Sequence, residues 1–165
     1  PWAARVGSLG ADPGGAGDGS FDLILANHSL YYVPDLDATA ARLLRLLAPR
    51  GRLIAALLDR RNALARLWRD GFAQAGLPFP FPLAEDAEAA FRRLGPQARR
   101  ETIRYAVTLP DQPTARRRVL RFLLGPEAAR RLPGSAESLF EPFTRDGRIL
   151  IETTYPHLVV QRPDG

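Results

Sequence analysis

The sequence contains no cysteine, no methionine and no lysine. The absence of cysteine excludes a disulfide framework, a thiolate metal site and a cysteine nucleophile. All 23 basic residues are arginines, and against 18 acidic residues they leave a formal net charge of +5. The absence of lysine, together with the many alanines, arginines, glycines and prolines, indicates a GC-rich coding bias more than a selected basic surface. Position 1 is proline, not methionine, so we expect a fragment whose upstream part is missing.

Long apolar runs are also missing. The longest ones, such as Leu53–Leu58, fall far short of the roughly 20 residues that span a bilayer. No charged leader followed by an apolar stretch opens the sequence, so nothing predicts export, and we expect a cytoplasmic protein. A length of 165 residues suits one ordinary domain. The apolar share of 45% and charged share of 25% are typical of a globular chain, not a disordered one.

Two short apolar runs predict buried strands, Phe21–Ala26 and Arg52–Leu58. Their length and the flanking glycines favour strands that are covered on both faces, as in a parallel sheet. A helix pattern lies between them. A strand, a helix and a strand joined by tight connections form a βαβ unit, which requires a parallel pair and a right-handed crossover. The sequence therefore predicts the α/β class.

The helix between the two strands follows from four apolar residues at i, i+3, i+4 and i+7. These residues are Ala40, Leu43, Leu44 and Leu47, and they place the helix near Asp37–Leu47. Asp35 or Asp37 is expected to cap its amino end. Pro49-Arg50-Gly51 predicts its carboxyl end.

The remaining chain alternates between helix and strand patterns. Helices are predicted at Asn62–Gln74, Ala84–Leu94, Thr114–Leu124, Glu127–Leu132 and Ala136–Phe143. Strands are predicted at Glu101–Leu109 and over Gly147–Arg162, with a break at Tyr155-Pro156. On the helix Thr114–Leu124 we expect Ala115, Val119, Phe122 and Leu123 to face inward and Arg116, Arg117 and Arg118 to face mostly outward.

Two stretches carry a family resemblance. Phe21–Asp35, which reads FDLILANHSLYYVPD, resembles the fourth strand and following loop of the class I S-adenosylmethionine-dependent methyltransferases. Leu43–Ile54, which reads LLRLLAPRGRLI, is similar to the helix and fifth strand that come next, with Arg50 in place of the first glycine of the family's usual Pro-Gly-Gly turn. The Leu-Tyr-Tyr-Val-x-Asp element is also similar to the corresponding loop of histamine N-methyltransferase and related small-molecule methyltransferases.

The resemblance implies a Rossmann-like sheet that is incomplete, with a helical insertion before the last strand. By this resemblance the whole chain is the C-terminal part of one methyltransferase domain. Its expected parts are a loop (1–20), a βαβ core with the following elements (21–109), the helical insertion (110–145) and a terminal β region (146–162). The final strand is expected to be antiparallel. The family's glycine-rich loop and its acidic ribose ligand have no counterpart here, so we expect this chain alone to be inactive and to bind the cofactor weakly.

The candidate site follows the first strand, because open α/β sheets bind ligands at the carboxyl ends of their strands. By the resemblance, Ala26, Asn27 and His28 are expected to contact S-adenosylmethionine. His28 either acts as a general base or bonds a neighbouring carbonyl. Tyr31 and Tyr32 are candidates to bind a cationic or aromatic acceptor, since aromatic faces attract ammonium groups. Of the two tyrosines, we expect Tyr32 to be the exposed one.

Other conspicuous residues favour structural roles. Asp35 is expected to be a helix cap, and Trp68 and Phe72 are expected in the core. Structural positions are also favoured for Tyr105, Tyr155 and His157. The basic cluster of Arg116, Arg117, Arg118 and Arg121 favours a solvated helix face over a nucleic-acid surface. No spacing of metal ligands and no Gly-x-Ser-x-Gly nucleophile elbow occurs.

These observations predict methyl transfer from S-adenosylmethionine to a small-molecule acceptor, as part of a longer enzyme. Methyl transfer is an in-line substitution at a sulfonium, so the protein mainly positions two reactants and excludes water. A base is needed only when the acceptor must lose a proton. The alternatives are an RNA or protein methyltransferase of the same fold, and a non-catalytic structural or binding fragment.

Overall fold

A computed structural model of the chain describes residues 17–96 and 98–162. Most of the loop that is expected over residues 1–20 lies outside the described residues, and its last part, from Gly17 to Ser20, forms a turn. The chain divides into two compact units. Among the described residues, unit 1 comprises 17–57, 81–96, 98–102 and 156–162, and unit 2 comprises Leu58–Pro80 and Ile103–Tyr155.

The βαβ arrangement in unit 1 confirms the prediction. Strands β1 (Phe21–Asn27) and β2 (Leu47–Ala56) are parallel neighbours, and helix α1 (Leu36–Leu46) connects them. The last residues of β5 (Arg148–Gln161) pair with β2 in the antiparallel direction. The strand order is β1-β2-β5-β3, where β3 spans Arg99–Pro110. The final strand is therefore inserted antiparallel, as the family resemblance implies.

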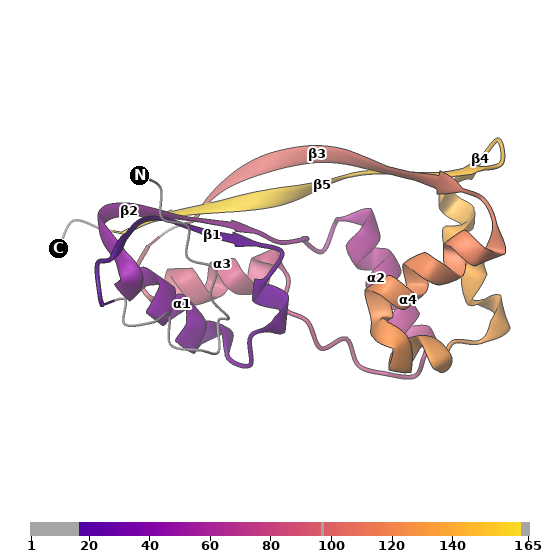
Figure 1. Cartoon of the computed structure of the whole chain (residues 1–165), viewed down its shortest axis with the longest axis horizontal. Coiled ribbons are helices and arrows are strands. Elements are labelled where there is room, and N and C mark those ends of the chain that lie inside the picture. Colours follow the sequence, from indigo (N-terminus) through magenta and orange to yellow (C-terminus); the bar gives the residue numbers. More distant parts are fainter. Residues whose placement is uncertain (1–16, 97, 163–165) are drawn as a thin grey trace. The chain divides into compact units, whose positions relative to one another are not determined.

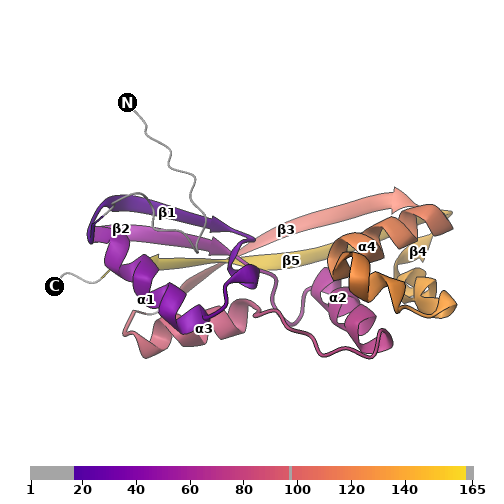
Figure 2. The same ribbon diagram turned by 60° about the horizontal axis from the view of Figure 1, so that its bottom comes forward.

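Helices α1 and α3 (Ala84–Arg93) lie on the same side of β1 and β2, as Figures 1 and 2 both show. Leu43 of α1 and Phe91 of α3 are buried in the core of this unit. Side chains alternate along a strand, so Leu23 and Leu25 of β1 face the other side, where they are 44% and 66% exposed. The expectation that this strand is covered on both faces is therefore wrong for the described residues.

The junction between α1 and β2 differs from the prediction. The helix ends at Leu46, and Pro49-Arg50-Gly51 belongs to the irregular start of β2 instead of ending the helix. Arg50 has a φ of 62°. A Cβ at Gly51 would lie 2.8 Å from the carbonyl oxygen of Ala48 and 2.9 Å from that of Phe21. Only glycine allows this close approach of β1 to β2.

Unit 2 is built from two helices, a 3-10 segment, a short strand and parts of the strands β3 and β5. Its elements are α2 (Ala63–Gln74), α4 (Pro113–Arg130), the 3-10 segment η2 (Gly134–Phe143) and β4 (Thr144–Arg145), which pairs with β5. The helices α2 and α4 pack closely, because Gly71 leaves space for the side chain of Leu124. Trp68 and Phe72 are buried and meet Phe79 edge-on, which confirms their predicted place in a core.

Helix α4 corrects two expectations about side-chain direction. Phe122 is 84% exposed, although its spacing predicts an inward position. Arg116 is not outward: its guanidinium donates hydrogen bonds to Asp111, to the carbonyl of Glu137 and to Thr144. The helix is also broken at Gly125, where φ is 76° and ψ is 165°, so the predicted helix Glu127–Leu132 is its second segment.

The terminal strand shows no break at Tyr155-Pro156, because β5 continues from Arg148 to Gln161. A proline lacks the N–H that a ladder needs, and the pairing of β5 with β2 begins one residue later, at His157. The short helix predicted at Ala136–Phe143 is present as part of η2, which has 3-10 geometry and begins two residues earlier, at Gly134. None of the helices within residues 17–96 and 98–162 combines the length and the apolar character that a membrane span requires.

Candidate active site

A sharp turn follows β1 at its carboxyl end. Ala26 is 4% exposed, and Asn27, the last strand residue, pairs with Ala56 of β2 and is exposed. His28 then adopts a left-handed conformation, with φ at 49°, which is uncommon for residues other than glycine. Its amide donates a hydrogen bond of 3.0 Å to the carbonyl of Ala56. The turn therefore fixes the backbone of His28 where β1 and β2 both end.

An aromatic group extends from this turn through the 3-10 helix η1 (Leu30–Tyr32). Leu30 and Tyr31 are buried, whereas Tyr32 is 71% exposed, as predicted. The rings of His28 and Tyr31 are stacked at 6.1 Å, and the Nδ1 atom of His28 lies 3.3 Å from the Tyr31 hydroxyl. The ring of Tyr32 meets Phe81 edge-on at 5.8 Å. The structure thus brings His28, Tyr31 and Tyr32 into one cluster.

A second histidine belongs to this edge of the sheet. His157 of β5 pairs with Ala56, the same residue that accepts the hydrogen bond from His28. Burial lowers the pKa of His28, and charge repulsion from His157 lowers that pKa further. The imidazole of His28 therefore stays neutral to a lower pH than an ordinary histidine. The sequence alone favoured a purely structural position for His157. Its place near His28 follows only from the long-range pairing of β2 with β5, which no local pattern predicts.

A buried polar cluster in unit 2 escaped the sequence reasoning. Asn62 is 1% exposed and caps α2, because its side-chain oxygen accepts from the amide of Ala65. Its side-chain nitrogen donates to the Tyr105 hydroxyl at 3.0 Å and to the carbonyl of Thr154 at 2.6 Å. Burial is the main cause that raises the pKa of Tyr105. An asparagine at the start of the predicted helix could have indicated the cap, but no local pattern indicates the partners of Asn62 in β3 and β5.

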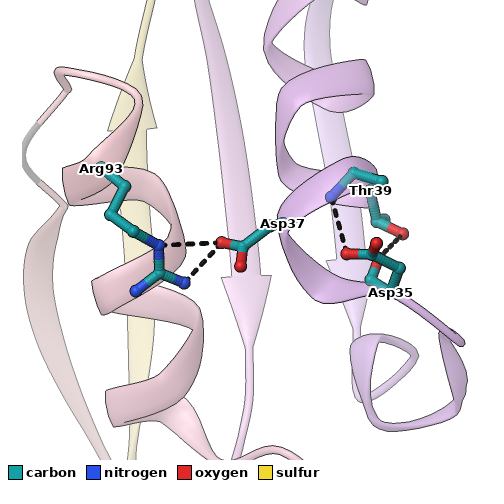
Figure 3. A network of polar contacts seen from close by, with 5 residues as sticks. Asp35, Asp37, Thr39 and Arg93 are labelled. Carbon is teal, nitrogen blue, oxygen red and sulfur yellow. Dashed lines mark hydrogen bonds and ion pairs between the residues drawn. The ribbon is translucent and has the colours of Figure 1, made fainter.

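Asp35 has the capping role that the sequence predicts, as Figure 3 shows. Its carboxylate accepts a hydrogen bond of 2.9 Å from the amide of Ala38 at the start of α1. The neighbouring Asp37 instead forms an exposed ion pair with Arg93 of α3. Neither carboxylate belongs to the aromatic cluster. Within the described residues, no group of three histidine or acidic side chains is placed to hold a metal ion.

Comparison with known proteins identifies the family. A family model described as "Methyltransferase domain" matches residues 8–98, more than half of the chain. The chain belongs to the methyltransferase domain family. No curated protein matches it.

Solved structures of low sequence identity share the fold. A protein of Bacillus halodurans named as a candidate methyltransferase is 14% identical, with a TM-score of 0.60, over 95% of this chain and 70% of that one. The YcgJ protein of Bacillus subtilis is 12% identical, with a TM-score of 0.58, over 96% of this chain and 70% of that one. A Thermotoga maritima S-adenosylmethionine-dependent methyltransferase, described as a possible histamine N-methyltransferase, is 17% identical, with a TM-score of 0.51, over 94% of this chain and 62% of that one. These matches confirm the Rossmann-like methyltransferase fold.

S-adenosylmethionine is the cofactor of the family to which this chain belongs. The groups at the carboxyl end of β1 fit its positively charged sulfonium. Burial and His157 lower the pKa of His28, which favours the neutral imidazole, and a neutral ring does not repel a cation. The exposed face of Tyr32 adds an aromatic surface, and aromatic faces attract cations.

Proposed function

We propose that this chain takes part in methyl transfer from S-adenosylmethionine to a small-molecule acceptor, and that the turn after β1 forms the site. The supporting observation is the left-handed turn at His28, which is bonded to Ala56 and stacked on Tyr31, with Tyr32 exposed beside them. The chain spans 70% of the length of the B. halodurans protein and 62% of the T. maritima protein. The activity is therefore proposed for the natural full-length protein.

Ala26, Asn27 and His28 are the residues that we assign to the cofactor. S-adenosylmethionine supplies an electrophilic methyl group on its sulfonium. Ala26 is small and buried, so the end of the strand offers backbone instead of a bulky side chain. The hydrogen bond from His28 to Ala56 holds that backbone in place. Fixed positioning of the two reactants lowers the barrier to such a substitution.

His28 has a second role in the proposal when the acceptor must lose a proton. A neutral imidazole accepts a proton, whereas an imidazolium does not, so the lowered pKa keeps this histidine in the useful form. The Tyr31 hydroxyl, 3.3 Å from Nδ1, orients the ring. General bases of this kind contribute about 10²–10⁴-fold to a rate.

Tyr32, supported edge-on by Phe81, is the residue that we assign to the acceptor, and Tyr31 forms the buried back of the same surface. An exposed aromatic face favours a cationic or aromatic small molecule. Histamine, a small amine, is named for the T. maritima structure, and small amines are the acceptors to test first. No comparable argument from the described residues favours an RNA or protein acceptor.

The test uses the natural full-length protein with S-adenosylmethionine that is labelled on its methyl group. We expect label in one or more small amines, and we expect Tyr32→Ala to weaken transfer more than Tyr32→Phe, which keeps the aromatic face. Label in RNA or protein, with none in small molecules, would support the alternative acceptors. Failure to bind labelled S-adenosylmethionine at millimolar concentration would leave the non-catalytic fragment as the correct interpretation.

A further inference from the structure

Unit 2 contains a cavity of about 500 Å³. It is lined by the two segments of α4, by Leu132 and Pro133, and by the first residues of η2. Its apolar part includes Leu120 and Ala136, both only 2% exposed, together with Leu132. A volume of this size is typical of small-molecule sites, which bury an apolar body and orient it with a few polar groups.

The charged residues of this cavity are three arginines and one glutamate. Arg117 is paired with the glutamate, because its Nε lies 2.6 Å from Oε1 of Glu137. Arg121 and Arg130 also line the cavity and are exposed to solvent. In the part of the chain that the structure describes, neither of these two guanidiniums forms an ion pair or a hydrogen bond. The cavity therefore carries two positive charges that no carboxylate of the described chain compensates.

The break in α4 places these arginines around one space. Arg117 and Arg121 are one turn apart on the first segment and so share a face of the helix. Arg130 comes from the second segment, after Gly125 with its positive φ and Pro126, and yet lines the same cavity. Arg118, from the same basic run, does not line it. The sequence predicted one solvated basic face, whereas the structure divides the basic residues between the cavity and the outside.

We propose that this cavity binds a small organic anion, which bears a carboxylate, sulfonate or phosphate group on an apolar body. The guanidiniums of Arg121 and Arg130 hold the anionic group, since arginine presents planar donors that match such oxygens. The apolar body lies against Leu120 and Ala136. This proposal does not depend on methyl transfer, because every residue that carries it belongs to unit 2.

Two fluorescent probes test the proposal on the full chain. Anilinonaphthalene sulfonate carries an anionic group on aromatic rings, and N-phenylnaphthylamine has the same rings without the sulfonate. We expect saturable binding of the sulfonate, and we expect the double variant R121Q/R130Q to raise its Kd at least about tenfold. The neutral probe is expected to bind equally to both proteins. R118Q removes one charge from the same helix outside the cavity and is expected to leave both dissociation constants unchanged.

Several outcomes would overturn the proposal. If R121Q/R130Q binds the sulfonate probe as tightly as the wild type, the probe does not bind at these two arginines. If R118Q weakens binding of the sulfonate probe as much as R121Q/R130Q does, the effect comes from the overall positive charge. Competition distinguishes an organic anion from a simple one. Octanoate is expected to displace the sulfonate probe at concentrations at which sodium sulfate does not, and equal displacement by both salts would remove the apolar half of the proposal. Circular dichroism checks that each variant folds. If the double variant does not fold, the single variants R121Q and R130Q are used in its place.

Discussion

The amide of His28 donates a hydrogen bond to the carbonyl of Ala56, and His157 pairs with that same alanine from the other side. Three strands therefore contribute to one short edge of the sheet: β1 through the turn at His28, β2 through Ala56 and β5 through His157. Edges of this kind, at the carboxyl ends of parallel strands, are where open α/β sheets bind ligands. The first predictions concern the residues that meet there.

Replacement of His28 by alanine is expected to lower turnover more than stability. If the imidazole is the general base, kcat falls by about 10²–10⁴-fold. If it only lines the acceptor pocket, KM for the acceptor changes more than kcat. Steady-state kinetics on the full-length protein separate these outcomes, and thermal unfolding of the same variant measures stability. Unaltered kcat and KM would remove His28 from the proposed site.

The second prediction concerns pH and uses His157→Gln. Burial and then His157 lower the pKa of His28 below its ordinary value of 6.5. Removal of the second imidazole removes the repulsion, so the pKa of His28 is expected to rise, and the acid limb of the pH–rate profile moves to higher pH. An imidazole with a lowered pKa binds its proton less readily in the folded than in the unfolded chain. The stability of the wild type is therefore expected to fall as the pH drops below 6.5, and this loss is smaller in the variant.

Nuclear magnetic resonance of the His28 ring measures this pKa directly, without any assay of activity. The Tyr31 hydroxyl also contacts the ring, so Tyr31→Phe is the matched comparison for the loss of one polar neighbour. Identical His28 titration in the wild type and in His157→Gln would contradict the prediction.

Tyr32→Ala is expected to act on binding of the acceptor and not on folding. Tyr32 is 71% exposed, and surface substitutions away from caps and cores change stability by about 0.5 kcal/mol or less. We expect a higher KM for a cationic acceptor and an unchanged midpoint of thermal unfolding. Tyr32→Phe keeps the aromatic face and is expected to behave like the wild type. A large loss of stability in Tyr32→Ala would indicate a packing role instead.

Asp35 provides a control that is close to the site in sequence but separate from its chemistry. Because its carboxylate caps α1 through the amide of Ala38, Asp35→Ala is expected to cost about 1 kcal/mol of unfolding free energy. Asp35→Asn keeps a capping oxygen and most of the stability. Asp37 forms an exposed ion pair with Arg93, so Asp37→Ala costs less than about 1 kcal/mol. Chemical denaturation ranks the three variants, and none is expected to change kcat.

The sequence patterns predicted the elements whose structure depends on residues that are close together in the chain. The apolar runs of β1 and β2 and the spacing of Ala40 and Leu43 were enough for the βαβ unit, because a buried strand and an amphipathic helix have different periods. The same reasoning failed in α4. The period gives Phe122 an inward position, but the helix buries the face that carries Leu120 and Leu124 instead, and Phe122 is exposed.

The candidate site was predicted in part for the same reason. Residues 26–32 comprise the end of a strand and the turn after it, and their place at the edge of a sheet follows from that order. The position of His157 depends on the register between β2 and β5, which no local period encodes. Arg116 shows the same limit, because its partners Glu137 and Thr144 come from later segments of the chain.

The last prediction concerns Asn62, which joins three elements of unit 2. It caps α2 through the amide of Ala65, and it donates to the Tyr105 hydroxyl of β3 and to the carbonyl of Thr154 in β5. Asn62→Ala removes a cap, worth about 1 kcal/mol, and leaves buried polar groups without their partner, at about 1–3 kcal/mol, so the expected total is roughly 2–4 kcal/mol.

Tyr105→Phe is the matched variant for this test, since it removes one hydroxyl and keeps the ring that meets Tyr155. It takes away the contacts between the hydroxyl and the side chain of Asn62 but leaves the cap and the hydrogen bond to Thr154 intact, so we expect a loss of about 1 kcal/mol. Urea denaturation of the two variants and of the double variant measures the coupling between the two residues. If Tyr105→Phe destabilises the chain as much as Asn62→Ala, the hydroxyl and not the cap dominates. If the two losses simply add in the double variant, the hydrogen bond between Asn62 and Tyr105 contributes nothing to stability.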